Sequence, residues 1–276
     1  MNAARFSAAS YWRCFAGVFV RELLRFVRQR ERFVAALVRP LIWLLIFAVG
    51  FRSILGVSII PPYETYILYE VYIVPGLAGM ILLFSGMQSS LSMVYDREMG
   101  SMRVLLISPL PRWFLLLSKL MSGVMVSLLQ VYVFLAIAWA YGIQPPPAGY
   151  LYVLPALMLG GFMLGAVGLL LSSLIKQLEN FAGVMNFVIF PAFFASSALY
   201  PLWRIQEVSP WLYWICQFNP FTHCVELIRF SLYGQLNVPA LAIVAVCASG
   251  LFGLAVVAYT PIRKAVPKGK PVSAGT

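Results

Sequence analysis

The chain has 276 residues, of which 62% are hydrophobic and only 11% are charged. Soluble domains are about 45–50% apolar and about 25% charged, so this composition excludes a soluble globular protein. Residues 120–175 contain no Asp, Glu, Lys or Arg. A helix needs about 20 apolar residues to cross the hydrocarbon core, so this stretch crosses a membrane more than once. The sequence therefore predicts an all-α polytopic membrane protein.

The net charge of +11 does not indicate a nucleic-acid partner, because no soluble basic domain is present to carry one. Eight arginines fall between Arg5 and Arg39, both included, and four basic residues follow Pro261. In membrane proteins, clusters of this kind flank the spans and set their orientation.

The segment 1–32 is predicted to form an amphipathic helix that lies at the inner membrane surface. Four arginines share one face at helical spacing, namely Arg21, Arg25, Arg28 and Arg32. Phe19 and Leu23 lie on the opposite face. The charged face is interpreted either as an orientation anchor or as a surface for headgroups or a cytoplasmic partner, and the two roles are compatible.

Apolar runs between charged or proline-rich breaks predict six transmembrane helices. Their expected ranges are 33–55, 69–95, 114–141, 150–175, 181–200 and 238–259. An even number of spans places both termini on one side. With the termini inside, 17 of the 20 basic residues lie on the inner side, and Arg52, Arg204 and Arg229 remain outside. The positive-inside rule therefore predicts that both termini are cytoplasmic.

The outer connection, 201–237, is apolar and interrupted by prolines. Ser209-Pro210 and Asn219-Pro220 each resemble an N-cap followed by proline at the first helical position, and Gly234 resembles a C-cap. The pattern predicts two short helices, at 210–217 and 220–233. Because each is too short to span a membrane, we expect a re-entrant helical hairpin in the outer leaflet.

The sequence contains no chemistry that would drive transport or catalysis. Span interiors lack the Asp, Glu or His residues of a proton relay, and His223 falls in the outer hairpin. There is no GxxxxGK[ST] phosphate loop, no GxSxG and no HExxH motif. The four cysteines show no metal-binding spacing. We expect no catalytic residue, no metal and no cofactor on this chain, and therefore a membrane subunit driven from outside.

The segment through which another protein would drive this subunit is the charged stretch 96–113, "DREMGSMRVLLISPLPRW". Met99, Met102 and Leu106 recur at i, i+3 and i+7, as on one face of a helix. Asp96, Arg97, Gly100, Ser101 and Arg103 lie largely away from that face. Pro109 and Pro111 would stop this helix. An ordinary solvated loop is the alternative interpretation.

At these residues the sequence resembles the permease subunits of type-2 ABC transporters, an exporter family. The shared pattern after the second span is an acidic-Arg-Glu-x-Gly run, an apolar stretch, a proline and a basic-aromatic pair. Two further stretches resemble the family in order, "NFVIFPAFFASSALYP" at 186–201 and "NPFTHCVELIRFSLYG" at 219–234. The sequence differs from the family pattern at Ser196-Ser197, where the family often has Ser-Gly. This difference bears on the geometry of the outer exit of the path.

The resemblance implies partners and a mode of coupling. Two copies of a separate ABC ATPase, which hold ATP and Mg, would act on two copies of this permease, a homodimer in a bacterial inner membrane. The 96–107 helix would seat in the ATPase. Its coupling residues would be Asp96, Arg97, Glu98, Met99, Gly100, Met102, Arg103 and Leu106. Arg28 or Arg32 would pair with Glu98 or Asp96 and carry the motion into span one.

The translocation path would lie between the two copies, lined by spans two and five. Its expected residues are Pro75, Gly76, Gly79, Asn186, Pro191, Ser196 and Ser197, and those of the outer hairpin are Asn219, Pro220, Glu226 and Arg229. Ordinary kinking and packing is an equal alternative for the prolines. The stripe Gly161, Gly165, Gly168 and Ser172 in span four is interpreted as packing within the subunit.

Two other classes of function stay open. One is an ion-coupled carrier or a channel that works without an ATPase, and the other is a membrane enzyme or assembly scaffold. The substrate also stays open among hydrophobic, lipidic and glycan compounds. A disulfide between Cys216 and Cys224 is a further possibility in an oxidising compartment.

Overall fold

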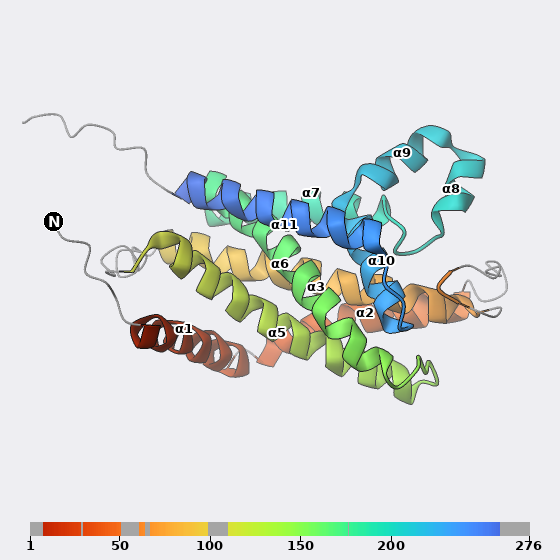
Figure 1. Cartoon of the computed structure of the whole chain (residues 1–276), viewed down its shortest axis with the longest axis horizontal. Helices are drawn as coiled ribbons and strands as arrows, with labels where there is room; N and C mark the ends of the chain where they lie inside the picture. The colour runs from red at the N-terminus through yellow and green to blue at the C-terminus, as the bar shows by residue number, and fades with distance from the viewer. Residues whose placement is uncertain are drawn as a thin grey trace, which may run out of the picture.

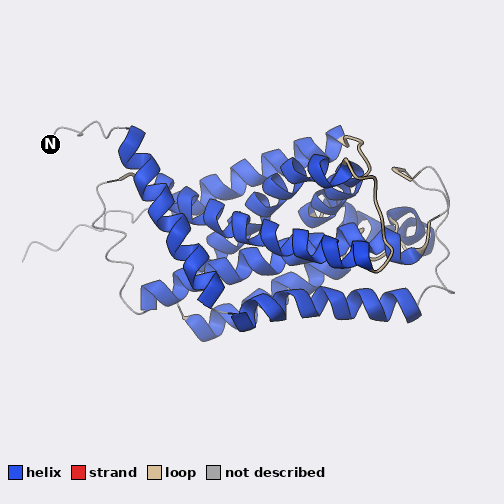
Figure 2. Ribbon diagram, turned by 90° about the horizontal axis from the view of Figure 1, so that it is seen from below, coloured by secondary structure: helices blue, strands red, loops and turns tan. Residues whose placement is uncertain are grey.

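The computed structural model of the chain describes residues 8–28, 30–50, 61–63, 67–98, 110–175 and 177–259. Every regular element within these residues is a helix, which confirms the expected all-α class. The long helices run along one axis (Figures 1 and 2). Helix α1 (Ala8–Arg28) lies at one end of this bundle, and the short helices α8 (Leu202–Val208) and α9 (Pro210–Phe218) lie at the other. We call these the α1 end and the α9 end.

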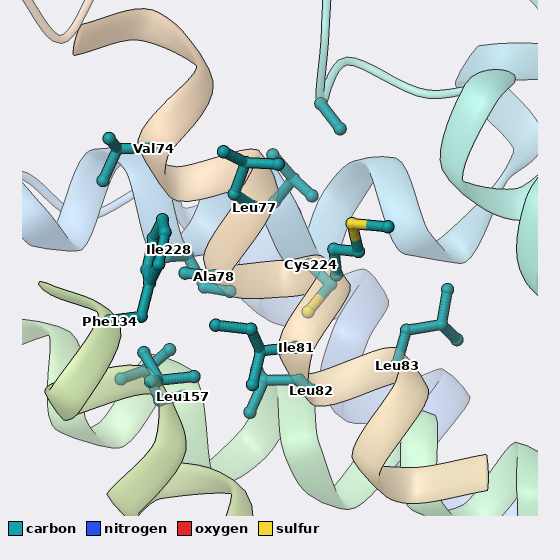
Figure 3. Close-up of a cluster of buried hydrophobic side chains, with 14 of the residues drawn as sticks. Val74, Leu77, Ala78, Ile81, Leu82, Leu83, Phe134, Leu157, Cys224 and Ile228 are labelled. Atoms are coloured by element: carbon teal, nitrogen blue, oxygen red, sulfur yellow. The ribbon is translucent and has the colours of Figure 1, made fainter. Parts of the chain in front are cut away.

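Helix α3 (Tyr69–Glu98) is the centre of the bundle. It packs against α2 (Arg30–Gly50), α5 (Arg112–Ala140), α6 (Gly149–Leu174), α7 (Leu178–Phe194) and α10 (Pro220–Leu232). In Figure 3, side chains of α3 such as Leu77 and Ile81 meet Phe134 of α5, Leu157 of α6 and Ile228 of α10. Within a bilayer, burying an apolar side chain between helices gains little hydrophobic free energy, because lipid tails are equally apolar. Close van der Waals packing must therefore hold these helices together.

Small residues provide that close packing between α3 and α6. A Cβ on Gly86 of α3 would lie 3.0 Å from the backbone of Gly165 on α6. A Cβ on Gly165 itself would lie 2.5 Å from the side chain of Leu120 on α5. Gly168 is similarly close to Ser90. The glycine stripe predicted in span four therefore serves contacts within the subunit.

Four helices are long and apolar enough to cross a membrane: α3, α5, α6 and α11 (Val238–Tyr259). Their bounds agree with the predicted spans 69–95, 114–141, 150–175 and 238–259 to within three residues. The two other predicted spans contain shorter apolar helices, Val34–Phe47 within α2 and Leu178–Phe194 in α7. Composition and length thus support a polytopic membrane protein, with four candidate spans among the described residues.

The structure differs from the expected layout in three places. The N-terminal helix ends at Arg28, and Arg32 belongs to the next helix, α2. Helix α7 ends at Phe194, so 195–200 are not helical; the carbonyls of Ala192 and Ala195 accept from the side chain of Asn219 instead of from a further helical turn. The outer connection holds three short helices instead of two, since α8 precedes the expected pair.

Candidate functional site

The charged motif of the sequence begins at the α1 end, where α3 finishes. There Asp96 of α3 lies beside Lys119 of α5, with 3.1 Å between the carboxylate Oδ2 and the ammonium Nζ. Both residues are buried, at 7% and 3% exposure. An ion pair taken out of water stays charged only when its geometry is good, because each charge loses its hydration. The pair therefore fastens the end of α3 to α5.

Helix α1 packs along α5 close to this pair. The ring of Tyr11 meets that of Phe114 edge to face, with 4.8 Å between centroids. These two rings, with Trp12 and Phe15, line an open apolar hollow. The first turns of α5 therefore contact both α1 and, through Lys119, the end of α3, so the three helices form one junction.

The predicted coupling residues fall partly within this junction. Glu98, the last residue of α3, is exposed, as are Arg21 and Arg28 on α1. Arg21 forms an ion pair of 3.0 Å with Glu22. The side chains of Arg25, Arg32 and Arg97, and the residues Met99, Gly100, Met102, Arg103 and Leu106, lie outside what the structure describes. The expected pairing of Arg28 or Arg32 with Glu98 or Asp96 stays a prediction.

Lys119 is a residue whose partner the sequence reasoning missed. The charge pattern counts it as one more inner positive charge, although it lies seven residues inside an apolar helix. A lysine in such a place needs a counter-charge, and Asp96 ends the preceding apolar run. That signal was available in the sequence.

A second polar cluster lies at the α9 end, around Arg229 of α10. This guanidinium is 2% exposed and forms an ion pair with Glu226 one turn earlier. Its Nη2 donates a hydrogen bond of 2.8 Å to the carbonyl of Ser197. The Tyr72 hydroxyl donates to the same carbonyl at 3.0 Å, and the Tyr72 ring lies 4.1 Å from the guanidinium carbon. Helices α3 and α10 thus hold the chain that leaves α7.

Asn219 joins α7 to α10 in the same region. Its side-chain oxygen accepts from the backbone amide of Phe221, as the predicted N-cap requires. Its Nδ2 donates to the carbonyls of Ala192 and Ala195, each at 2.7 Å. Ala192 is in the last turn of α7 and Ala195 is its C-cap, where carbonyls have no helical donor. Pro220 occupies the first position of α10 as predicted, whereas Ser209 caps α9 without a side-chain bond.

The predicted path residues separate into two groups. Pro75, Gly76 and Gly79 on α3, and Ser196 and Ser197 after α7, are buried inside the subunit. A Cβ on Gly76 would lie 2.4 Å from the carbonyl oxygen of Ala198, so this glycine permits a close backbone approach. Asn186 and Pro191 are exposed instead, on the open face of α7. Their role in a path stays a prediction.

The remaining chemistry of the described residues is sparse. No group of three His, Cys, Asp or Glu side chains gathers there. His223 forms a hydrogen bond of 2.9 Å with the carbonyl of Gln217, consistent with a structural side chain. Cys216 and Cys224 are free thiols, so the possible disulfide is not formed in this structure. Burial raises the pKa of the Cys216 thiol above its usual value.

Comparison with known proteins agrees with this architecture. Residues 14–233 match the family described as ABC-2 type transporter. The chain is 33% identical over 165 residues to an Escherichia coli K12 protein named "Probable multidrug ABC transporter permease YbhR", covering 58% of this chain and 43% of that protein. The matched part is thus less than half of the length of that relative.

A longer match is the Cyanophora paradoxa protein named "Putative transport permease ycf38", 27% identical over 241 residues, which cover 83% of this chain and 79% of the relative. The Pyropia yezoensis protein of the same name is 27% identical over 229 residues, or 80% and 74% of the two chains. The family match spans most of the chain and includes both polar clusters described above. The chain therefore belongs to the ABC-2 type transporter family and is a type-2 ABC permease subunit.

Proposed function

We propose that this permease is the membrane subunit of an ATP-driven exporter and that a separate ABC ATPase drives it through the segment after α3. The observation that carries the proposal is the buried pair Asp96–Lys119, at the point where α3 leads into 99–109. The pair joins α3 to α5, and α5 in turn packs against α1, so the three helices are connected at this point. A push on the segment would therefore move three helices together.

The rest of the expected assembly belongs to the same proposal. Two permease copies and two ATPase subunits form the transporter, and ATP with Mg binds on the ATPases. The shorter helices α2 and α7 complete six crossings, and α9 and α10 form the outer re-entrant hairpin. Both termini are cytoplasmic in a bacterial inner membrane, in line with the bias of the basic residues. The path carries a hydrophobic, lipidic or glycan substrate.

The ion-coupled alternative has less support. Proton-coupled carriers use acidic or histidine side chains within their spans. In α5, α6 and α11 there is no acidic residue and no histidine, and the acidic residues of the α3 span lie at its two ends, Glu70 in the first turn and Asp96 beside Lys119. This distribution favours a driving force that arises outside the permease.

The test is affinity purification of the tagged full-length chain from its own membranes, followed by ATP hydrolysis in proteoliposomes. We expect an ABC ATPase to co-purify and its hydrolysis to depend on the permease. Asp96→Asn should lower that dependence while the complex still forms. Arg204→Gln, an exposed charge change on α8 at the opposite end of the bundle, is the control. Transport that persists with no ATPase in the preparation contradicts the proposal.

A further inference from the structure

Arg39 is a cation in the middle of an apolar helix. It lies within the apolar stretch Val34–Phe47 of α2, and its guanidinium carbon is 3.9 Å from the centroid of the Phe84 ring on α3. Phe84 lies at the midpoint of α3, which runs from Tyr69 to Glu98. Because a helix rises about 1.5 Å per residue, Phe84 is about 22 Å from either end of α3. The guanidinium stands near the mid-depth of the bundle.

The surroundings of this guanidinium are aromatic, with polar groups at their edge. Phe84 packs edge to face on Phe190 of α7, with 6.3 Å between centroids. Asn186, one turn before Phe190, is exposed, and Gln88, one turn after Phe84, is half-buried. Arg39 itself is exposed. Helices α2, α3 and α7 thus present an open surface with a cation on an aromatic floor, which we call the Arg39 surface.

Among the described residues no acidic side chain contacts Arg39, whose recorded contact is the Phe84 ring. The nearest acidic position along α2 is Glu31, about 12 Å away at the helical rise per residue. The nearest along α3 is Asp96, about 18 Å from Phe84. Along α7 it is Glu179, about 16 Å from Phe190.

This arrangement constrains what covers the surface. An unpaired guanidinium facing lipid tails at mid-depth is strongly unfavourable, so the surface does not face the tails alone. Along the described helices α2, α3 and α7, every acidic position thus lies about 12 Å or more from this depth. A bound anion would supply the counter-charge that the described residues do not provide at this depth.

We propose that the Arg39 surface binds the anionic group of an amphiphile, with the apolar part of that molecule on the exposed ring of Phe190, while the buried ring of Phe84 supports the guanidinium from below. The inference rests on the proposed transport function and narrows its substrate class to compounds that carry a phosphate or carboxylate on an apolar body. Arginine suits this role because its planar fork donates to both oxygens of such a group while its face stays on an aromatic ring.

Photolabelling of the full-length permease tests the proposal without needing transport. The protein is placed in phosphatidylcholine nanodiscs with a benzophenone-tailed alkyl phosphate, or with the matching alkyl trimethylammonium, and labelled peptides are mapped by mass spectrometry. We expect saturable labelling of α2, α3 and α7 by the phosphate and not by the ammonium. Equal labelling of these helices by both probes would overturn the proposal, whatever the behaviour of any variant.

Variants then assign the effect to Arg39. Arg39→Gln should raise the half-saturating phosphate concentration about tenfold or more, the loss expected for one charge-assisted hydrogen bond. Arg39→Lys keeps the charge and should retain most of the binding. Arg204→Gln is the matched control, because Arg204 is an exposed arginine that also stacks on an aromatic ring, that of Trp203 on α8. Unchanged binding in Arg39→Gln would contradict the proposal.

A competition arm identifies the source of the anionic group. If phosphatidylglycerol in the nanodisc displaces the probe, the natural ligand is an anionic lipid of the bilayer. If it does not displace the probe, the ligand is a soluble amphiphile, and both results support the site. If the proposed function is wrong but this site exists, the phosphate probe still labels the permease, while ATP hydrolysis does not depend on the permease.

Discussion

At the scale of single residues, buried charges and amides fix how the helix ends meet. The pair Asp96–Lys119 holds α3 to α5 at one end, and Asn219 holds α7 to α10 at the other. Such groups are costly when they lose a partner, because the group left behind stays out of water. Each of these contacts therefore makes a measurable prediction about stability.

Asp96→Asn should destabilise the permease by about 3–5 kcal/mol, because Lys119 then remains buried without a counter-charge. The double change Asp96→Asn with Lys119→Met should recover part of this loss, since no buried charge is left unpaired. Thermal unfolding of the purified protein in detergent measures both effects in a double-mutant cycle. Additive losses in the double variant would show that the two side chains do not interact.

Asn219→Ala should lower the free energy of unfolding by about 2–3 kcal/mol. The change removes one helix cap and leaves the carbonyls of Ala192 and Ala195 without their donor. The control is Asn237→Ala, which removes a cap at the start of α11, where the side chain accepts from the amide of Ala240. That control should cost only about 1 kcal/mol. Equal losses in unfolding experiments would count against a bridging role for Asn219.

At the scale of helices, close backbone approach sets the packing. Gly76→Ala should destabilise by more than about 1 kcal/mol, because a Cβ there would lie 2.4 Å from the backbone oxygen of Ala198. Gly183→Ala is the matched control, since its Cβ would meet nothing within 4 Å and alanine favours a helix by about 1 kcal/mol. Thermal unfolding of the two variants should therefore shift in opposite directions. Shifts of the same sign and size would contradict this packing.

The helices could be predicted from sequence largely because an apolar run closed by charges or prolines permits few other structures. The bounds of α3, α5, α6 and α11 follow that pattern, as does the start of α10 at Asn219-Pro220. The extra helix α8 was not predicted, because a seven-residue helix has no periodicity to distinguish it from a loop. Likewise the end of α7 depends on Asn219, which lies far from Phe194 along the chain.

The candidate sites were less predictable than the helices. The motif identifies Asn219 and Glu226–Arg229, but their partner, the carbonyl of Ser197, comes from another part of the chain. Gly76 and Gly79 are expected to line the path, and that role stays a prediction; the structure shows them packed against neighbouring segments, which the sequence does not identify. The charge pattern counts Arg39 with the inner positive charges. Its contact with Phe84 could not be predicted, because that contact forms only when α2 packs against α3.

At the scale of the whole molecule, the structure separates three regions along one axis. The junction of α1, α3 and α5 lies at the α1 end, the Arg39 surface near the middle, and the Arg229 cluster toward the α9 end. Helix α3 contributes to all three regions, so under the proposed coupling a movement at one end would reach the others through a single helix. This is the arrangement that a permease driven from one side requires.

The most direct test of the account is the rate of ATP hydrolysis by the co-purified ATPase in proteoliposomes, with wild-type permease and with Val104→Pro. A proline there would break the amphipathic helix expected at 96–107 without touching the described helices. The account predicts that the wild-type permease raises the rate and that Val104→Pro, although folded and inserted, does not. A rate that is the same with both permeases, or the same without any permease, would contradict it.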